Sequence, residues 1–137
     1  MQKKIRYTLG KEERLKSRKI IEQLFKVGKL FTAYPFRIIW KYQVEPNGSP
    51  LQAGFTVSTK YFKKAVDRNR IRRLMKEGYR VQKYALQTTL ENANRQLVIF
   101  FIYVGKEIPE HGLVVEKMAF VINRLQNIVN EDASTNN

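Results

Sequence analysis

The order of apolar and polar residues predicts one helix followed by three strands in the first part of the chain. Between Ser17, a residue type that caps helix N-termini, and Gly28, apolar residues recur every three or four positions, which predicts an amphipathic helix over residues 17–28. The apolar period then changes to two, which predicts strands over residues 30–33, 36–42 and 51–58, with a turn at residues 45–50. Alternation in the second and third strands predicts a sheet with one dry face and one mixed face.

The remaining apolar pattern predicts two more helices around one strand. The composition of residues 63–90 is helical, residues 96–104 form a strand too apolar to be half exposed, and residues 114–129 repeat apolar side chains at helical spacing. This order of elements predicts a two-layer α/β sandwich, in which three helices pack on a four-stranded sheet. Residues 1–137 are expected to form a single domain, with a basic arm at residues 1–16 and a polar tail at residues 130–137.

The charge along the chain is strongly asymmetric. Lysine and arginine number 26 against 12 aspartates and glutamates, which gives a formal net charge of +14. Residues 1–83 hold 22 of the basic and 6 of the acidic side chains, a net of +16, whereas residues 84–137 hold 4 and 6, a net of −2. This asymmetry predicts that one part of the chain meets a polyanion, with nucleic acid the leading candidate, while the other part supplies scaffold. The alternative is a basic surface that only keeps the protein soluble.

The inventory of reactive residues argues against a bare catalytic domain. The chain has no cysteine and a single histidine, His111, which we place in a loop; thiol nucleophiles, disulfides and Cys/His zinc sites are therefore excluded. The longest apolar run, residues 97–104, is far shorter than the roughly 20 residues needed to cross a bilayer. The basic N-terminus leads into charged residues, unlike a secretory signal. We therefore expect a cytoplasmic protein with no membrane partner.

Residues 63–80 carry the strongest functional signal. At 100° per residue, the apolar residues at positions 71, 74, 75 and 78 fall on one side of a helix and the basic residues on the other. The basic side holds five cations around one amide: Arg68, Asn69, Arg72, Arg73, Lys76 and Arg80. Like charges this close repel each other unless a counter-charge arrives, and a merely soluble face would interleave glutamates. We expect this face to bind phosphates with a steep dependence on salt.

The same helix carries a family pattern. Residues 65–74 read Ala-Val-Asp-Arg-Asn-Arg-Ile-Arg-Arg-Leu, which resembles the signature of the bacterial ribonuclease P protein family. Flanking pieces agree with that family: Arg-Leu-Lys at residues 14–16, Phe-Lys-Val-Gly at 25–28, Gly-Phe-Thr-Val-Ser at 54–58 and Gly-Lys at 105–106. The resemblance covers residues 12–128. Ordered matches with this spacing are specific, whereas a lone Arg-Asn-Arg means little.

The resemblance implies a protein subunit that joins a catalytic RNA. In that family the RNA, with bound Mg²⁺, hydrolyses the bond between the 5′ leader and the body of precursor tRNA, while the protein supplies no catalytic residue and binds no cofactor or metal on its own. The implied partners are the catalytic RNA and precursor tRNA, and no protein partner is required. The implied fold resembles the second domain of ribosomal protein S5, with a left-handed strand–helix–strand crossover that periodicity does not predict.

Two sets of contact residues follow from the resemblance. The basic helix is expected to contact the catalytic RNA through Arg68, Asn69, Arg70, Arg72, Arg73, Lys76 and Arg80. A cleft between the first helix and the mixed sheet face is expected to hold the single-stranded leader through Ile21, Phe25, Arg37, Ile39, Thr56 and Ser58. The chain departs from the family pattern at Ile21, where relatives often have an aromatic ring, and at Lys76, where arginine is commoner. Tyr61 and Phe62, just before the basic helix, have no assigned role.

The sequence leaves two other functions open. A structural RNA-binding protein of the ribosomal type shares the same sandwich and would leave leader removal untouched. A duplex-DNA-binding protein would place the basic helix in a major groove. Stimulation of leader removal by a catalytic RNA separates the first interpretation from both.

Overall fold

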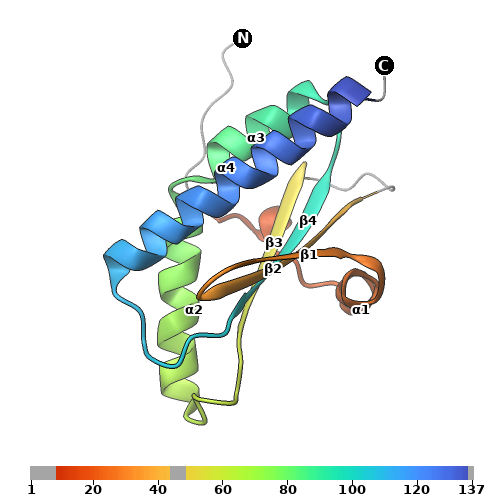
Figure 1. The fold of residues 1–137 in the computed structure, drawn as a ribbon. Helices are drawn as coiled ribbons and strands as arrows, with labels where there is room; N and C mark the ends of the chain where they lie inside the picture. Colours follow the sequence, from red (N-terminus) through yellow and green to blue (C-terminus); the bar gives the residue numbers. More distant parts are fainter. Residues whose placement is uncertain (1–8, 44–48, 136–137) are drawn as a thin grey trace.

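A mixed four-stranded sheet forms the centre of the computed structural model, which describes residues 9–43 and 49–135 (Figure 1). The strands are β1 (Lys29–Ala33), β2 (Phe36–Tyr42), β3 (Leu51–Val57) and β4 (Leu97–Tyr103), and their order across the sheet is β1-β2-β4-β3. β2 pairs antiparallel with both β1 and β4, whereas β3 and β4 are parallel. The four strands agree with the predicted ones to within one residue at each end, because alternation locates β1 to β3 and a continuous apolar run locates β4.

Helices before and after the sheet complete the fold: η1 (Lys11–Glu13, a 3-10 turn), α1 (Arg18–Val27), α2 (Ala65–Arg80), α3 (Lys83–Asn92) and α4 (His111–Thr135). α1 matches the predicted first helix. Ser17 caps it, because the Ser17 hydroxyl oxygen accepts a hydrogen bond from the N–H of Ile20 at 3.3 Å. Gly28 ends it at a close approach of the chain, since a Cβ atom there would lie 2.4 Å from the carbonyl oxygen of Leu24.

The prediction of one helix over residues 63–90, and hence of three helices, is wrong. The chain turns at Val81 and Gln82, so the described residues form four α-helices. A helix over residues 63–90 would be about 42 Å long, whereas a seven-residue strand spans only about 23 Å. The turn lets α3 pack along α4 and contact β3 instead of projecting past the sheet (Figure 1). Gln82 stabilises the turn, because its side-chain amide donates to the carbonyl oxygens of Gly78 and Val115 at 3.0 and 3.1 Å.

α4 is longer than predicted at both ends. His111, expected in a loop, is its first residue, and residues 130–135, expected in a polar tail, continue the helix; residues 136 and 137 lie outside the described part of the chain. The extra turns are held to the sheet, because the carboxylate of Asp132 accepts a hydrogen bond from the Tyr42 hydroxyl at 2.5 Å. Burial, together with this carboxylate, raises the pKa of Tyr42. A polar sequence therefore stays helical because a tertiary contact fixes its end.

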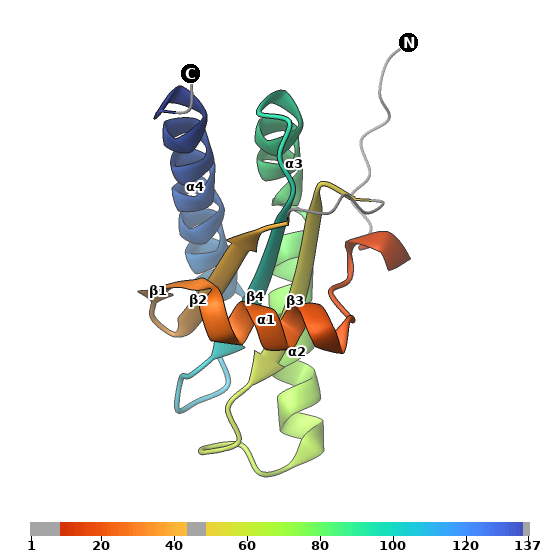
Figure 2. The same ribbon diagram turned by 90° about the vertical axis from the view of Figure 1, so that its right-hand side faces the viewer.

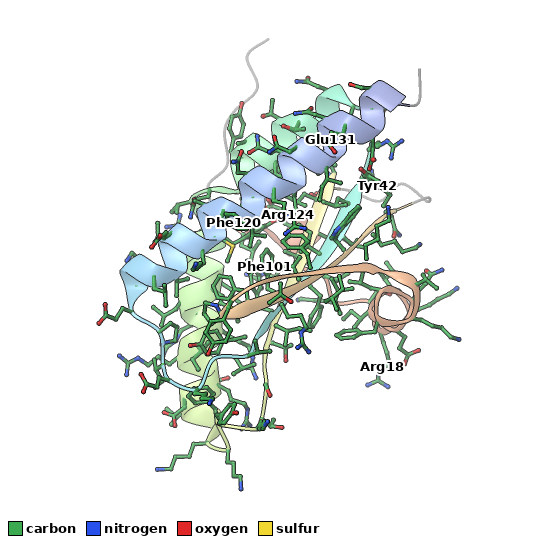
Figure 3. The ribbon with its side chains drawn as sticks, in the orientation of Figure 1. Arg18, Tyr42, Phe101, Phe120, Arg124 and Glu131 are labelled. Atoms are coloured by element: carbon green, nitrogen blue, oxygen red, sulfur yellow. The ribbon has the colours of Figure 1, made fainter. Side chains whose placement is uncertain are left out.

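The helices cover both faces of the sheet (Figure 2). α2, α3 and α4 pack on one face over the larger hydrophobic cluster, which includes the fully buried Phe36 and Phe101 (Figure 3). α1 lies across the opposite face, over a smaller cluster made of Leu15, Leu24, Ile39 and Val98. The expected two-layer sandwich therefore gains a partial third layer. The predicted mixed face is drier than expected because α1 covers part of it.

The predicted basic arm divides into two parts. Residues 1–8 lie outside the described residues, as do residues 44–48 around the predicted turn. Residues 9–16 instead lie against the domain, because the N–H of Leu15 donates to the carbonyl oxygen of Ala53 at 2.9 Å and the Leu15 side chain is buried. Over the ranges that the structure describes, no helix combines the length and apolarity needed to span a membrane.

Candidate nucleic-acid interface

α2 presents its basic residues to solvent because its apolar residues are anchored in the core. Ile71, Met75 and Gly78 are one or two turns apart and are buried, and α2 packs against α4 and β3. The seven predicted contact residues are exposed or half-buried: Arg68, Asn69, Arg70, Arg72, Arg73, Lys76 and Arg80. The division of this helix into an apolar face and a basic face is therefore confirmed, while the contacts themselves stay a prediction.

Two of the arginines have side-chain partners on the same helix. Arg72 donates to the side-chain oxygen of Asn69 at 2.6 Å. Arg80 forms an ion pair with Glu77 at 2.5 Å, and the hydrogen bond from Arg80 holds the pKa of the Glu77 carboxyl below its usual range. The row of uncompensated cations is thus shorter than the sequence suggested, since one of the five has a carboxylate beside it.

Arg68 is tied to the backbone that precedes α2. One of its guanidinium nitrogens donates to the carbonyl oxygens of Phe62 and Lys63, at 2.9 and 2.8 Å. Hydrogen bonds from a charged donor are roughly twice as strong as neutral ones, so this side chain stabilises the turn between β3 and α2. Arg68 therefore has a structural role in addition to any contact with RNA.

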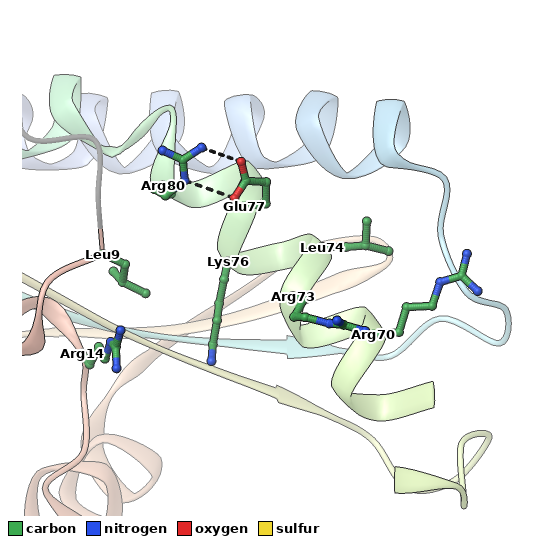
Figure 4. Close-up of a pocket in the computed structure, with 8 residues that line it drawn as sticks. All are labelled: Leu9, Arg14, Arg70, Arg73, Leu74, Lys76, Glu77 and Arg80. Carbon is green, nitrogen blue, oxygen red and sulfur yellow. Dashed lines mark hydrogen bonds and ion pairs between the residues drawn. The ribbon is translucent and has the colours of Figure 1, made fainter. Parts of the chain in front are cut away.

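A basic hollow lies between α2 and the N-terminal segment (Figure 4). Its volume is about 780 Å³, and α2 lines it with Arg70, Arg73, Leu74, Lys76, Glu77 and Arg80. Leu9 and Arg14 line it from the N-terminal segment. Within residues 9–43 and 49–135, Arg70, Arg73 and Lys76 form no hydrogen bond or ion pair through their side chains. The hollow therefore offers at least three unengaged cations to an anionic ligand. Arg14 was not predicted, because its place depends on how the arm packs.

A buried ion pair holds Arg14 beside α2. The ammonium of Lys83, which is fully buried, pairs with the carboxylate of Glu13. Glu13 also accepts hydrogen bonds from the N–H of Gly10 and from the amide of Gln87, both at 2.7 Å. Burial raises the pKa of Glu13, but these hydrogen bonds and the Lys83 charge outweigh burial and hold that pKa below its ordinary value. The N-terminal segment is thus fixed to α3 through a residue adjacent to Arg14.

The sheet face under α1 has a covered part. In-register pairing places Ile39, Phe100 and Gly54 side by side across β2, β4 and β3. The ring of Phe25, from α1, packs edge-on against Phe100 with ring centres 5.3 Å apart. Gly54 makes room for the Phe100 ring, because a Cβ atom at position 54 would lie 2.8 Å from that ring. Phe100 therefore forms the sheet surface that the C-terminal part of α1 contacts through Phe25.

The next row of the same face is more open. Arg37 and Thr56 flank Ile102 across the sheet, and Ser58 follows at the end of β3. Arg37 is exposed, while Thr56, Ile102 and Ser58 are half-buried. Polar side chains thus surround the half-buried Ile102 beside α1.

The six predicted leader contacts are therefore not equally accessible. Phe25 is 51% exposed and Ile21 is half-buried, so both have surface to offer. Ile39 is only 8% exposed, contrary to its expected place on an open face, because α1 covers it. Phe100 and Ile102 were not among the predicted contacts, since the apolar run of β4 gave no alternation that would reveal which residues face α1.

Comparison with known proteins separates the interpretations that the sequence left open. The model of the family described as Ribonuclease P matches residues 9–108, which include α1, α2 and the whole sheet. The chain belongs to the ribonuclease P protein family. It is 32% identical over 130 residues to the ribonuclease P protein component of Porphyromonas gingivalis, with 95% of each chain covered. The component from Chlorobium phaeobacteroides is 28% identical over 129 residues, which cover 87% of this chain and 88% of that one.

A solved structure agrees with the fold. The ribonuclease P protein of Staphylococcus aureus superposes with a TM-score of 0.65 over 83% of this chain and 95% of its own, at 20% sequence identity. At that identity the likeness shows the fold alone. As a member of the ribonuclease P protein family, the chain is an RNA-binding component of a ribonucleoprotein that processes tRNA.

Proposed function

We propose that this ribonuclease P protein binds the catalytic RNA through the basic face of α2 and the single-stranded 5′ leader of precursor tRNA through the cleft between α1 and the sheet. The observation that carries the proposal is the placement of α1 and α2 on opposite faces of one sheet (Figure 2). Two RNA segments have separate surfaces to bind at the same time. A single small domain thereby links substrate to catalyst.

The chemistry of α2 suits a folded RNA. Structured RNA is recognised largely by the positions of its phosphates, and a rigid helix holds cations at fixed spacing. Arginine adds forked hydrogen bonds that lysine does not provide. Within the described residues, the side chains of Arg70, Arg73 and Lys76, and of Arg14 across the hollow, form no hydrogen bond or ion pair, so they are available to phosphates. If about five cations neutralise phosphates, the logarithm of the affinity falls with the logarithm of the salt concentration with a slope of about −4.

The cleft suits a single strand of no fixed sequence. Unpaired bases present π faces, which stack on aromatic and apolar side chains with little base preference. Phe25 and Ile21 supply such surface from α1, and Ile102 supplies it from the sheet. Arg37 offers a cation to the backbone phosphates, with the hydroxyl group of Thr56 nearby on β3 and that of Ser58 just after the strand. Ile39 is buried between α1 and the sheet, so it packs against this surface without being exposed on it.

The reaction itself is assigned to the RNA subunit and its Mg²⁺. Over the described ranges, no three carboxylate or histidine side chains gather in a group that could hold a metal ion. The protein contributes positioning, because holding the leader raises its effective concentration at the metal site of the RNA. We also expect a left-handed crossover from β3 through α2 and α3 to β4, a fold of the ribosomal S5 type, a cytoplasmic location and no protein partner.

A cleavage assay tests this function. The full chain is added to a bacterial ribonuclease P RNA and leader-bearing precursor tRNA at low Mg²⁺, where we expect cleavage to accelerate. A variant with Arg70, Arg73 and Lys76 all replaced by alanine, shown to be folded by circular dichroism, should give less stimulation. No stimulation by the folded protein would contradict the proposal. Co-sedimentation with ribosomal subunits would then favour a ribosomal role, and equal affinity for random duplex DNA would favour a DNA-binding role.

A further inference from the structure

An exposed aromatic ring with two lysines lies outside both proposed surfaces. Tyr61 is in the turn between β3 and α2 and is 42% exposed. The ammonium of Lys60 lies 5.3 Å from the centre of its ring, and the ammonium of Lys106, from the segment after β4, lies 5.8 Å from it. Both lysines are exposed, and neither forms an ion pair within the described part of the chain. Segments 45 residues apart thus place two unneutralised cations around one ring.

The backbone beneath this ring is firmly held. The next residue, Phe62, is buried and its ring centre lies 6.1 Å from that of Tyr103. The carbonyl oxygen of Phe62 accepts a hydrogen bond from Arg68 at 2.9 Å. On the other side, the N–H of Lys60 donates to the Ser58 hydroxyl at 3.3 Å. A ligand that stacks on Tyr61 therefore meets a preorganised surface and orders little backbone on binding.

The turn that carries Tyr61 follows the proposed leader cleft directly along the chain. Ser58, the last predicted contact of the cleft, is bound to the sheet through its N–H, which donates to the carbonyl oxygen of Tyr103 at 3.0 Å. Tyr61 follows three residues later in the same turn. A leader strand that runs along β3 past Thr56 to Ser58 therefore approaches the turn that holds Tyr61.

We propose that Tyr61 is a stacking platform for one unpaired base of the leader, and that Lys60 and Lys106 bind phosphates on either side of that base. This inference rests on the proposed function of the cleft and adds a subsite beyond it. An aromatic ring between cations matches the chemistry of a single nucleotide, whose base stacks while its phosphates pair with ammonium groups. A paired region of the catalytic RNA offers no free base face, so the leader is the favoured occupant.

Magnitudes decide whether a base can replace a lysine at the ring. A cation–π contact at an exposed site is worth only about a two- to fivefold change in an equilibrium constant. Stacking of a base on an aromatic side chain is worth about 5- to 150-fold. A lysine displaced from the ring by a base also gains a phosphate partner. The lysines therefore occupy the ring in the free protein and yield it when the leader binds.

The test uses holoenzyme assembled from the full chain and a bacterial ribonuclease P RNA. Precursor tRNAs carry a single 2-aminopurine at successive leader positions, so that stacking is read as quenching of fluorescence. Tyr61→Ala should weaken binding of leader-bearing precursor about tenfold and relieve quenching at one leader position, with no change for mature tRNA. Tyr61→Phe should keep both properties because the ring remains. Phe120→Ala is the matched control, since Phe120 is also an exposed ring, 54% accessible, on α4 (Figure 3).

The outcomes separate this subsite from the function on which it rests. If Phe25→Ala weakens leader binding and Tyr61→Ala does not, the platform is absent and the cleft stands. If neither variant affects leader binding, the proposed function of the cleft fails as well. If Tyr61→Ala weakens binding of the catalytic RNA itself, the platform belongs to that RNA and the inference is overturned. Should Tyr61→Ala fold poorly, the double change of Lys60 and Lys106 to alanine is expected to lower leader affinity at low salt, and unchanged affinity overturns the inference.

Discussion

Individual arginines of α2 differ in what they contribute to folding. Arg68 donates to two backbone carbonyl oxygens, whereas Arg73 is exposed and, within the described residues, forms no hydrogen bond or ion pair. Both look equivalent in the sequence, where they occupy one basic face of a helix. The structure separates them, because Arg68 is bonded to the backbone before α2 and Arg73 is not.

Replacing each of these arginines by alanine should therefore have different effects. We expect Arg73→Ala to weaken binding of the catalytic RNA by about 1–3 kcal/mol, through loss of a charge-assisted contact, and to change the free energy of unfolding by less than about 0.5 kcal/mol. Arg68→Ala should in addition lower the free energy of unfolding by about 1–3 kcal/mol. Urea denaturation and RNA titration measure the two quantities. Equal stability losses for both variants would contradict this distinction.

The buried pair of Glu13 and Lys83 makes stability depend on pH. Because the pKa of Glu13 is lower in the folded chain than in the unfolded one, its ionisation stabilises the fold above the unfolded pKa of about 4.3. That contribution is lost as the pH falls through the folded pKa. Removal of one member of a buried pair typically costs about 3–5 kcal/mol, since the other charge stays buried.

Glu13→Ala should accordingly lower the free energy of unfolding by about 3–5 kcal/mol at pH 7. The difference from the unmodified chain should shrink as the pH falls below about 4. Urea denaturation at pH 7 and pH 3 measures it, and Glu12→Ala, at an exposed neighbouring position, is the control. A difference that stays constant across this pH range would show that the ion pair does not supply the stability.

At the scale of elements, local sequence patterns predicted most helix and strand boundaries but missed those that depend on tertiary contacts. Ser17 and Gly28 bracket α1 as predicted, because caps and close approaches are local. The end of α2 was not predicted, since the turn there depends on a hydrogen bond from the Gln82 side chain to the carbonyl oxygen of Val115 on α4. The covering of Ile39 by α1 was not predicted either, because alternation within a strand does not show which helix covers a sheet face. Both depend on residues distant in sequence.

Gln82→Ala tests the origin of the turn between α2 and α3. The variant loses two hydrogen bonds to the carbonyl oxygens of Gly78 and Val115, which should lower the free energy of unfolding by about 1–3 kcal/mol. Gln23→Ala makes the same substitution at an exposed position of α1 and should cost less than about 0.5 kcal/mol. Equal losses in urea denaturation would mean that the turn does not depend on the Gln82 side chain.

At the scale of the whole molecule, the charge asymmetry of the chain matches the separation between the proposed RNA-binding surfaces and the elements that complete the core. Residues 1–83, with a net charge of +16, supply the N-terminal segment, α1, β1 to β3 and α2, which carry both proposed surfaces except for Ile102. The remaining residues, with a net of −2, supply β4, α4 and nearly all of α3, which complete the core. Composition predicted this polarity. It did not predict that Arg14 lies beside α2, because that contact depends on Glu13 reaching Lys83 across 70 residues.

The central claim is that α2 binds the catalyst while α1 and the sheet bind the leader. The most direct measurement is the preference of the holoenzyme for leader-bearing precursor over mature tRNA, as the ratio of the two dissociation constants at saturating protein. Phe25→Ala should reduce this ratio about 5- to 150-fold, whereas Arg73→Ala should leave the ratio unchanged although it weakens assembly with the catalytic RNA. A ratio that falls equally for both variants, or for neither, would contradict separate surfaces for the two RNAs.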